Sequence, residues 1–208
     1  MKPLFFIISL FPKILYVCLV DLYLYIRIYK IFSSYKITKV NLEIAYPELS
    51  KTEIELISKL SIRESLISGF ETLYTWGRSP HQSNNQLFKI ENNFLLCKTY
   101  EEKNGLITVA IHNRSVDMLL GWINSKIKTV SLYKKIKINV LEKFVKKNRE
   151  YGESKSYETS IGGVRKIFQA LKSKGAICFA ADQVPQRGLG KYIKLYNRDA
   201  YTTTLVQS

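Results

Sequence analysis

Hydrophobic residues dominate the first thirty positions of the chain. The segment Leu4–Ile31 is rich in Leu, Ile, Phe, Val and Tyr, and only Lys13 and Asp21 interrupt its first two dozen residues. It is long enough to cross a bilayer, which needs ~20 apolar residues, but two charges and Pro12 make it a poor span. An amphipathic segment lying in the interface is the competing interpretation. A buried helix of a soluble protein is less favoured, because it would need apolar neighbours on every side. We therefore expect residues 1–31 to form one membrane-associated helix that anchors the chain.

Basic residues follow this segment directly, and tyrosines run through it. The basic residues are Arg27, Lys30, Lys36 and Lys39, and the tyrosines are Tyr16, Tyr23, Tyr25 and Tyr29. Tyrosine prefers the headgroup level, and a basic cluster beside an apolar segment is typical of the cytoplasmic side. The pattern therefore predicts that the rest of the chain lies on the cytoplasmic face of the membrane.

A helical region is expected next. Asn41–Ser50 is interpreted as a connector, and Ser50 with Glu53 has the spacing of a capping box. Apolar residues at helical spacing then predict one or two helices up to about Trp76. Residues Gly77–Asn93 are polar and rich in turn formers, which predicts a loop.

From Lys89 onward, short apolar runs alternate with amphipathic stretches. The expected strands are Ile107–Ile111, Ile127–Leu132, Ala176–Ala180 and Tyr192–Leu195; the expected helices are Val116–Ile123, Val140–Val145 and Val164–Leu171. Alternation of strands and helices is typical of α/β proteins with parallel sheets. We therefore predict an α/β fold with a mixed, largely parallel sheet flanked by helices.

Composition narrows the classes of partner. The 208 residues contain 32 Lys and Arg against 17 Asp and Glu, a net charge of +15. Such a charge favours nucleic acid, an anionic membrane or an acidic ligand as partner. No nucleic-acid-binding module is recognisable, so that class is the weaker alternative.

Cys18, Cys97 and Cys178 are scattered and odd in number, which predicts neither a disulfide framework nor a zinc site.

The candidate chemistry is concentrated in Leu106–Trp122. His112 follows an expected strand, and Asp117 falls in the first turn of the expected helix. The carboxyl ends of strands in α/β sheets are where ligands bind. A carboxylate that orients a histidine creates a general base. The H-x4-D spacing therefore predicts a catalytic pair, His112 as base and Asp117 as its orienting partner.

Six segments stand out in order along the chain: Asn41-Leu-Glu-Ile-Ala-Tyr-Pro-Glu-Leu-Ser, His112 with Asp117, Arg149-Glu-Tyr-Gly, Gly162–Gly175, Ala181-Asp-Gln, and Tyr192–Thr204. Together they resemble the lipid A biosynthesis acyltransferases, the lauroyl/myristoyl family within the broader glycerolipid-type acyltransferases. The family usually has Glu where Asp117 stands, and Phe-Phe-Gly-Arg where this chain has Leu195-Tyr-Asn-Arg198. Its members continue well beyond Ser208, so we expect residues 32–208 to be an acyltransferase domain that is incomplete at its C-terminus.

The resemblance implies an enzyme that transfers a fatty acyl chain from acyl-acyl carrier protein to a hydroxyl of a lipid A precursor. His112 and Asp117 would be catalytic, and Arg149, Asp182, Gln183 and Arg198 would bind substrate. No cofactor or metal is implied. The implied partners are acyl carrier protein, the lipid A precursor and an anionic membrane surface, and the implied location is the cytoplasmic side of the bacterial inner membrane. The alternative within the family is a truncated, non-catalytic, membrane-bound relic.

One further basic group has three interpretations. Lys134, Lys135, Lys137, Lys143, Lys146 and Lys147 lie close together in the sequence. They could form a solvated helix face, a surface for anionic lipid, or a docking site for the acidic carrier protein.

Overall fold

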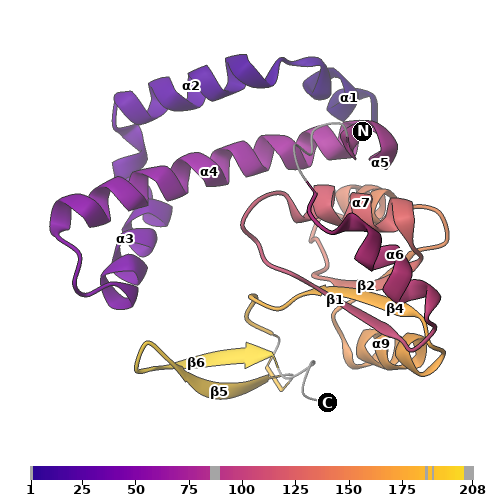
Figure 1. Ribbon diagram of the computed structural model, residues 1–208. Coiled ribbons are helices and arrows are strands. Elements are labelled where there is room, and N and C mark those ends of the chain that lie inside the picture. The colour runs from indigo at the N-terminus through magenta and orange to yellow at the C-terminus, as the bar shows by residue number, and fades with distance from the viewer. Residues whose placement is uncertain (1, 85–89, 186, 189, 204–208) are drawn as a thin grey trace.

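A computed structural model of the chain describes residues 2–84, 90–185, 187–188 and 190–203. The chain forms a helical arm followed by an α/β part (Figure 1). The arm contains α1 (Lys2–Leu10), α2 (Lys13–Tyr25), a 3-10 helix (Ile28–Ile31), α3 (Ser33–Ala45), α4 (Lys51–Gly77) and α5 (Pro80–Asn84). The α/β part contains α6 (Asn93–Glu101), β1 (Leu106–Ala110), α7 (Val116–Lys126), β2 (Thr129–Tyr133), α8 (Asn139–Arg149), β3 (Lys155–Glu158), α9 (Ile161–Lys172), β4 (Ala176–Ala180), β5 (Gly190–Leu195) and β6 (Arg198–Thr203).

The main sheet has the strand order β1-β4-β2-β3, and all its pairings are parallel. β4 comes last in sequence among these four strands, yet it is inserted between β1 and β2. Its register with β1 runs from Leu106 opposite Ala176 to Ala110 opposite Ala180. The predicted α/β class with a parallel sheet flanked by helices is confirmed, and the sheet order makes the ends of β1 and β4 neighbours.

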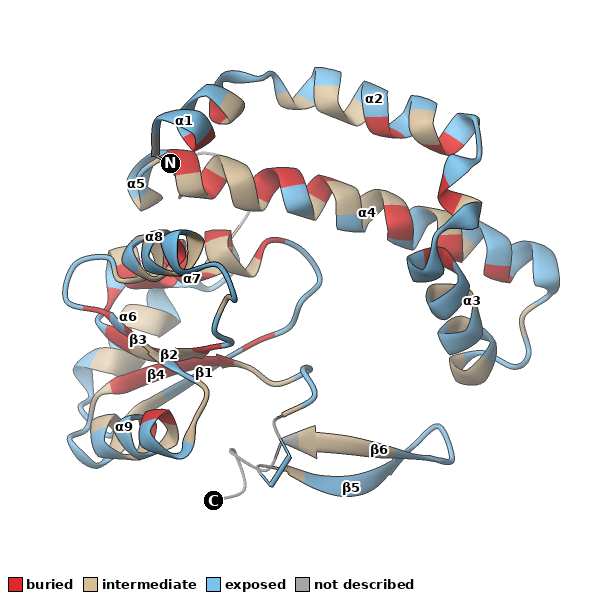
Figure 2. Ribbon diagram, turned by 180° about the vertical axis from the view of Figure 1, so that it is seen from behind, coloured by how far each residue is buried: buried red, intermediate tan, exposed pale blue. Residues whose placement is uncertain are grey.

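Alternating side chains of β4 build a core on each face of the sheet. Ala176 and Cys178 pack with Leu120 and Ile123 of α7 on one face. Ile177 and Phe179 pack with α9 on the other face. This alternation follows from the two-residue period of a strand, and Figure 2 shows β4 buried between the two helical layers. Burial also raises the pKa of the Cys178 thiol, in keeping with a core residue.

Helix α4 is the spine of the helical arm, with α1, α2 and α3 packed along it (Figure 1). The predicted capping box starts this helix: the Ser50 hydroxyl accepts a hydrogen bond from the Glu53 amide, and the Glu53 carboxylate accepts one from the Ser50 amide. The 27 residues of α4 extend for ~40 Å at ~1.5 Å per residue. α4 therefore reaches from the far end of the arm to α7 of the α/β part.

The N-terminal apolar segment is not one helix, contrary to the expectation. α1 and α2 meet at Pro12, where the chain bends by 80°. Proline lacks the amide hydrogen and clashes with the preceding turn, so it starts α2 and cannot continue α1. No single described helix is long and apolar enough to span a membrane, whereas α1 and α2 together have the length and composition for it.

Other elements differ in detail from the sequence prediction. β3 was not expected, since its one buried position is Ser156 rather than an aliphatic residue. The connector Asn41–Ser50 is helical up to Ala45, and the polar loop Gly77–Asn93 contains the short helix α5. The expected strand Tyr192–Leu195 is confirmed as part of a β5–β6 hairpin. Thr204 and the residues after it, like residues 85–89 of the polar loop, lie outside the described residues.

A glycine sets the distance between α9 and the strand end before it. A Cβ atom added to Gly163 would lie 2.1 Å from the carbonyl oxygen of Glu158 and 3.1 Å from Leu132. A Cβ atom added to the preceding Gly162 would meet only the Ser160 hydroxyl, at 3.7 Å. The two adjacent glycines therefore differ in the space they leave for a side chain.

We expect Gly163→Ala to destabilise the protein by about 1–3 kcal/mol, the usual range for overpacking. Gly162→Ala is the matched control and should be neutral or stabilising by up to about 1 kcal/mol, as alanine replaces glycine in a helix. Urea unfolding midpoints of the two variants provide the measurement. Equal losses in both variants would show that α9 does not depend on the close approach at Gly163.

Candidate active site

His112 and Asp182 meet at the carboxyl ends of two neighbouring strands. His112 lies two residues beyond β1, and Asp182 lies two residues beyond β4. The parallel pairing continues past the strands, since the Ala181 amide donates to the Ala110 carbonyl at 3.2 Å. Asp182 then accepts two hydrogen bonds from His112, one from ring Nδ1 at 2.8 Å and one from the backbone amide at 2.7 Å. One carboxylate therefore holds both the backbone and the ring of the histidine.

The hydrogen-bond partners define the tautomer of the His112 ring. Nδ1 must carry a proton to donate to the Asp182 carboxylate. The side-chain amide nitrogen of Gln183 lies 3.0 Å from Nε2, and this group can only donate. The neutral ring is thus protonated on Nδ1 and presents a lone pair at Nε2, which is the form required of a general base.

The electrostatics of Asp182 favour its charged form. Partial burial raises the pKa of Asp182, but the hydrogen bonds from the ring and backbone of His112 outweigh this effect and lower the pKa below its usual value. Asp182 is therefore a carboxylate at neutral pH and stabilises a positive charge on the His112 ring.

The expected contact between His112 and Asp117 is wrong: the structure pairs His112 with Asp182 and Asp117 with Arg149. Asp117 lies in the first turn of α7 and accepts two hydrogen bonds from Arg149, at 2.6 and 3.1 Å. This two-point ion pair directs the Asp117 carboxylate toward α8. The carboxylate on the His112 ring comes from the neighbouring strand end instead. The sequence placed Asp182 among the substrate-binding residues and missed its contact with the histidine.

Arg149 is held in place by both its side chain and its backbone. Burial lowers the pKa of Arg149, but the hydrogen bonds and charge of Asp117 outweigh burial and raise it. The Arg149 carbonyl accepts a hydrogen bond from the Asn124 side chain at 2.9 Å, and Asn124 in turn accepts one from the Thr129 hydroxyl at 2.6 Å. A buried polar network thus positions the C-terminal end of α8 against α7 and β2.

The loop after His112 is tied to α4 of the helical arm. Arg114 donates to Glu71 at 3.1 and 2.5 Å and to Glu64 at 2.7 Å. The Thr72 hydroxyl also lies 3.1 Å from the hydroxyl of Ser115, whose side chain caps α7 by accepting from the Met118 amide. Burial raises the pKa of Glu71, but its hydrogen bonds to Arg114 and Lys13 outweigh burial and lower it. The charged carboxylate of Glu71 therefore links α2, α4 and the histidine loop.

A cavity of about 310 Å³ opens beside this group. Its polar lining includes His112, Asp117, Arg149 and Gln183, so the structure brings together four of the six predicted site residues around one space. The apolar lining includes Leu119, Leu120, Leu132, Ile136 and Phe179. The cavity therefore combines the His112 imidazole and cationic side chains with apolar walls.

Tyr133 also lines the cavity and is kept protonated. Burial and a short hydrogen bond to the Glu142 carboxylate raise the pKa of Tyr133 to about 12. Its hydroxyl donates to Glu142, which is fixed in turn by the backbone amide of Ile136 at 2.8 Å. The resulting contacts hold the start of α8 to the end of β2 at the rim of the cavity.

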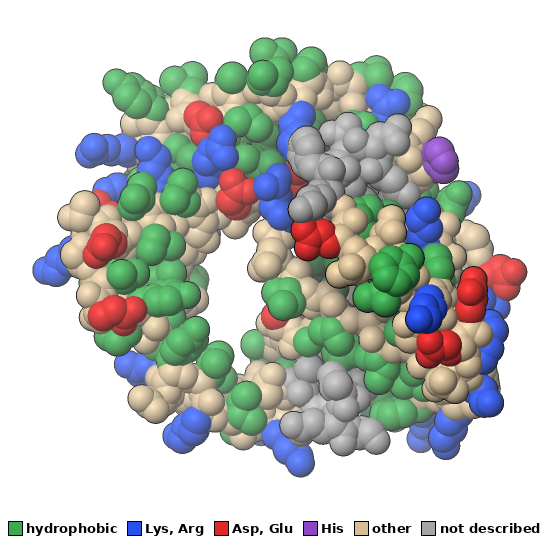
Figure 3. Space-filling view, in the orientation of Figure 1, with side chains coloured by type: hydrophobic (Ala, Val, Ile, Leu, Met, Phe, Trp, Pro, Cys, Tyr) green, Lys and Arg blue, Asp and Glu red, His purple; other side chains and the backbone are tan. Residues whose placement is uncertain are grey.

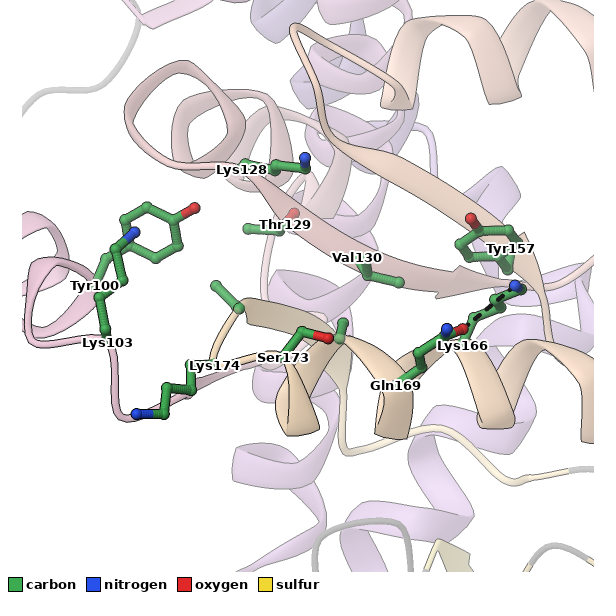
Figure 4. Close-up of a pocket in the computed structure, with 13 residues that line it drawn as sticks. Tyr100, Lys103, Lys128, Thr129, Val130, Tyr157, Lys166, Gln169, Ser173 and Lys174 are labelled. Atoms are coloured by element: carbon green, nitrogen blue, oxygen red, sulfur yellow. Dashed lines mark hydrogen bonds between the residues drawn. The ribbon is translucent and has the colours of Figure 1, made fainter.

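A different cavity, of about 430 Å³, lies at the opposite ends of the strands (Figure 4). It is lined by the first residues of β2 and β4, by the end of α9, and by Lys103, Lys128, Lys166 and Lys174. Lys128 is paired with Glu153 at 2.9 Å. Lys174 follows the C-terminal end of α9, where a positive charge offsets the partial negative charge of the last helical carbonyl groups. Its place at the amino ends of the strands separates this cavity from His112.

The remaining predicted residue lies elsewhere. Arg198 begins β6, is exposed, and is not among the described residues that line the His112 cavity. The turn before it, Tyr196-Asn197, has positive φ at both positions, as the tight turn of a two-residue hairpin requires. Among the described residues, no group of three or more His, Cys, Asp or Glu side chains is arranged to hold a metal ion.

We expect the neutral His112 ring to be protonated on Nδ1, and Asp182→Asn to shift the proton to Nε2. The backbone amide of His112 can only donate, so it would face the Asn oxygen, and the Asn amino group would face Nδ1. Nitrogen-15 NMR of the imidazole, in a His81→Gln background that leaves one histidine, distinguishes the two tautomers. An Nε2 proton in the variant that retains Asp182 would contradict the geometry of the pair.

A known protein family matches nearly the whole chain. The family model described as bacterial lipid A biosynthesis acyltransferase matches residues 4–207, nearly the whole chain and all the residues of the His112 cavity. No curated protein matches the sequence. The match extends over both the helical arm and the α/β part, and we conclude that this chain belongs to the bacterial lipid A biosynthesis acyltransferase family.

Proposed function

We propose that this protein transfers a fatty acyl chain from acyl-acyl carrier protein to a hydroxyl group of a lipid A precursor, with His112 as the general base. The observation that carries the proposal is the hydrogen bond from Nδ1 of His112 to Asp182, because it leaves Nε2 unprotonated, bonded to the Gln183 amide at the edge of a partly apolar cavity. The family supplies the reaction class and the lipid A pathway.

In the proposed reaction, a hydroxyl of the acceptor replaces the Gln183 amide at Nε2 of His112. Nε2 removes the hydroxyl proton as the oxygen attacks the carbonyl carbon of the thioester. The carbon–sulfur bond then breaks, and the proton on the imidazolium passes to the departing thiolate of the carrier. Asp182 stabilises the imidazolium throughout, as the carboxylate of a catalytic triad does.

We assign the acceptor's phosphate groups to the cationic side of the cavity. Arg149, Arg114 and Lys134 all line it, and guanidinium groups suit phosphate oxygens because they donate in a planar fork. The ion pair with Asp117 would hold the Arg149 fork in a fixed orientation. In this assignment Asp117 acts through Arg149, rather than on the histidine.

For the acyl carrier protein we propose a docking surface on α8 and the loop before it. The exposed lysines there are Lys134, Lys135, Lys137, Lys143 and Lys147. The surface adjoins the cavity, since Lys134 and Ile136 line the cavity rim. An acidic carrier is complementary to this charge, and its thioester would enter the cavity from the same side. We place the enzyme on the cytoplasmic side of the bacterial inner membrane, where the lipid A precursor would be available to it.

His112→Ala should lower kcat/KM for acyl transfer from acyl-acyl carrier protein to a lipid A precursor by about 10²–10⁴-fold, the usual contribution of a general base. His81→Ala is the matched control, since His81 is exposed on α5, and it should retain full activity. The measurement is the initial rate with detergent-solubilised acceptor, together with circular dichroism to verify folding.

A folded His112→Ala variant with wild-type activity would contradict the assignment of the base. If the wild-type chain itself transfers no acyl group but still binds lipid, the non-catalytic relic would be the correct interpretation.

A further inference from the structure

Helix α2 has one outer face that is entirely apolar. Leu15, Leu19, Leu22 and Ile26 recur at helical spacing along this face, and each is between 49% and 56% exposed. On α1, the exposed residues Leu4, Ile7 and Leu10 continue the surface beyond the bend. We call these seven residues the outer stripe. Figure 3 shows hydrophobic side chains gathered along the upper edge of the molecule, over α1 and α2.

The two charged side chains of α2 are paired with residues of α4. Lys13 pairs with Glu71 at 2.9 Å, and Asp21 receives two hydrogen bonds from Arg63, at 2.6 and 3.1 Å. Val20 and Leu24 of the same helix are buried. The two charges that interrupt the hydrophobic sequence are therefore neutralised on the inner side, and neither one disturbs the outer stripe.

An apolar groove lies between this pair of helices and α4. Its volume is about 620 Å³, and its lining includes Ile7, Phe11, Leu66, Phe70 and Leu73. The Tyr16 hydroxyl, which also borders the groove, is already bonded to the Leu66 carbonyl at 2.9 Å. A groove with such walls suits a hydrocarbon chain rather than a polar ligand.

The charge around the outer stripe fits an anionic lipid surface. Residues 1–40 contain six Lys or Arg and one acidic residue, Asp21, which is paired with Arg63. Tyr25, the last residue of α2, is 79% exposed, and the exposed Arg27 and Lys36 follow it. Tyrosine and basic residues beside an apolar surface are typical of segments at the headgroup level.

We propose that α1 and α2 bind the membrane in its plane, with the outer stripe immersed in one leaflet and α4 on the side away from the lipid. α2 is ~20 Å long at ~1.5 Å per residue, shorter than the ~30 Å hydrocarbon core. A straight span would require the 80° bend to open and would separate Lys13 and Asp21 from Glu71 and Arg63. An unpaired charge inside the bilayer is costly, so the observed ion pairs favour the in-plane arrangement.

This inference is independent of the catalytic assignment, because none of its residues takes part in the proposed reaction. An inactive variant, such as His112→Ala, should bind membranes like the wild type. A failure of membrane binding and a failure of catalysis can therefore be distinguished.

Spin-label depth measurement on the full chain tests the proposal. Single cysteines replace Leu15, Leu19, Leu22 or Ile26 in a Cys18→Ser/Cys97→Ser background, in which the remaining Cys178 is buried. The labelled proteins are bound to vesicles of phosphatidylethanolamine and phosphatidylglycerol, and depth is obtained from collisions with oxygen and a water-soluble nickel complex. We expect all four labels at one shallow depth, about 5–10 Å below the headgroups.

A spanning helix would instead place the first and last labels at depths that differ by about 16 Å, from the rise of an α-helix. That gradient, or full exposure of all four labels to the nickel complex, would overturn the proposal.

A charge substitution with a matched control gives the second measurement. Leu19→Glu should reduce binding to the same vesicles by about tenfold or more, since it puts a charge in the immersed face. Ile161→Glu is the control: Ile161 is similarly exposed but lies on α9, below the sheet (Figure 1), and its binding should be unchanged. Equal binding by the two folded variants would contradict the proposed surface.

Discussion

The parallel pairing of β1 with β4 is the constraint on which the site depends. Ala110 lies opposite Ala180, although the two are 70 positions apart in the sequence. The backbone bond from Ala181 to Ala110 carries the register beyond both strands. His112 and Asp182 are each two residues past this point. A slip of one residue would turn one of the two side chains to the other side of the sheet. The register therefore creates the pair, and the pair defines the tautomer of the histidine.

Helix α4 provides the second constraint, since it joins α2 of the helical arm to the loop that follows His112. Glu71 bonds to Lys13 on one side and to Arg114 on the other, and Thr72 contacts the capping residue of α7. One turn of α4 therefore positions both α2 and the loop that follows His112. The proposed base and the proposed lipid-binding surface are therefore linked through α4, although no residue of that surface takes part in the proposed reaction.

Local sequence patterns predicted most of the α/β part but not its contacts. The apolar runs that form β1 and β4 and the helical stripe of α9 were recognisable, because each buries aliphatic side chains at a regular period. β3 was not, as its one buried position is Ser156 and the buried residue just before the strand is Ser154. His112 was identified from its place at a strand end. Its partner was taken to be Asp117, five residues away, because strand order is not encoded locally and the insertion of β4 beside β1 could not be seen.

Pro12 signalled the break between α1 and α2. The direction of the Lys13 and Asp21 side chains could not be predicted, because it depends on the packing of α2 against α4.

The central claim is that His112 acts as a base only because Asp182 holds it, and a double-mutant cycle on acyl transfer tests it most directly. The rates of the wild type, Asp182→Asn, His112→Ala and the double variant are compared under one set of conditions. Asp182→Asn should slow the wild type by about 10²–10⁴-fold, since it reverses the tautomer, and should have no further effect once His112 is alanine. A loss of the same factor in both backgrounds would show that Asp182 acts independently of the histidine and would contradict the account.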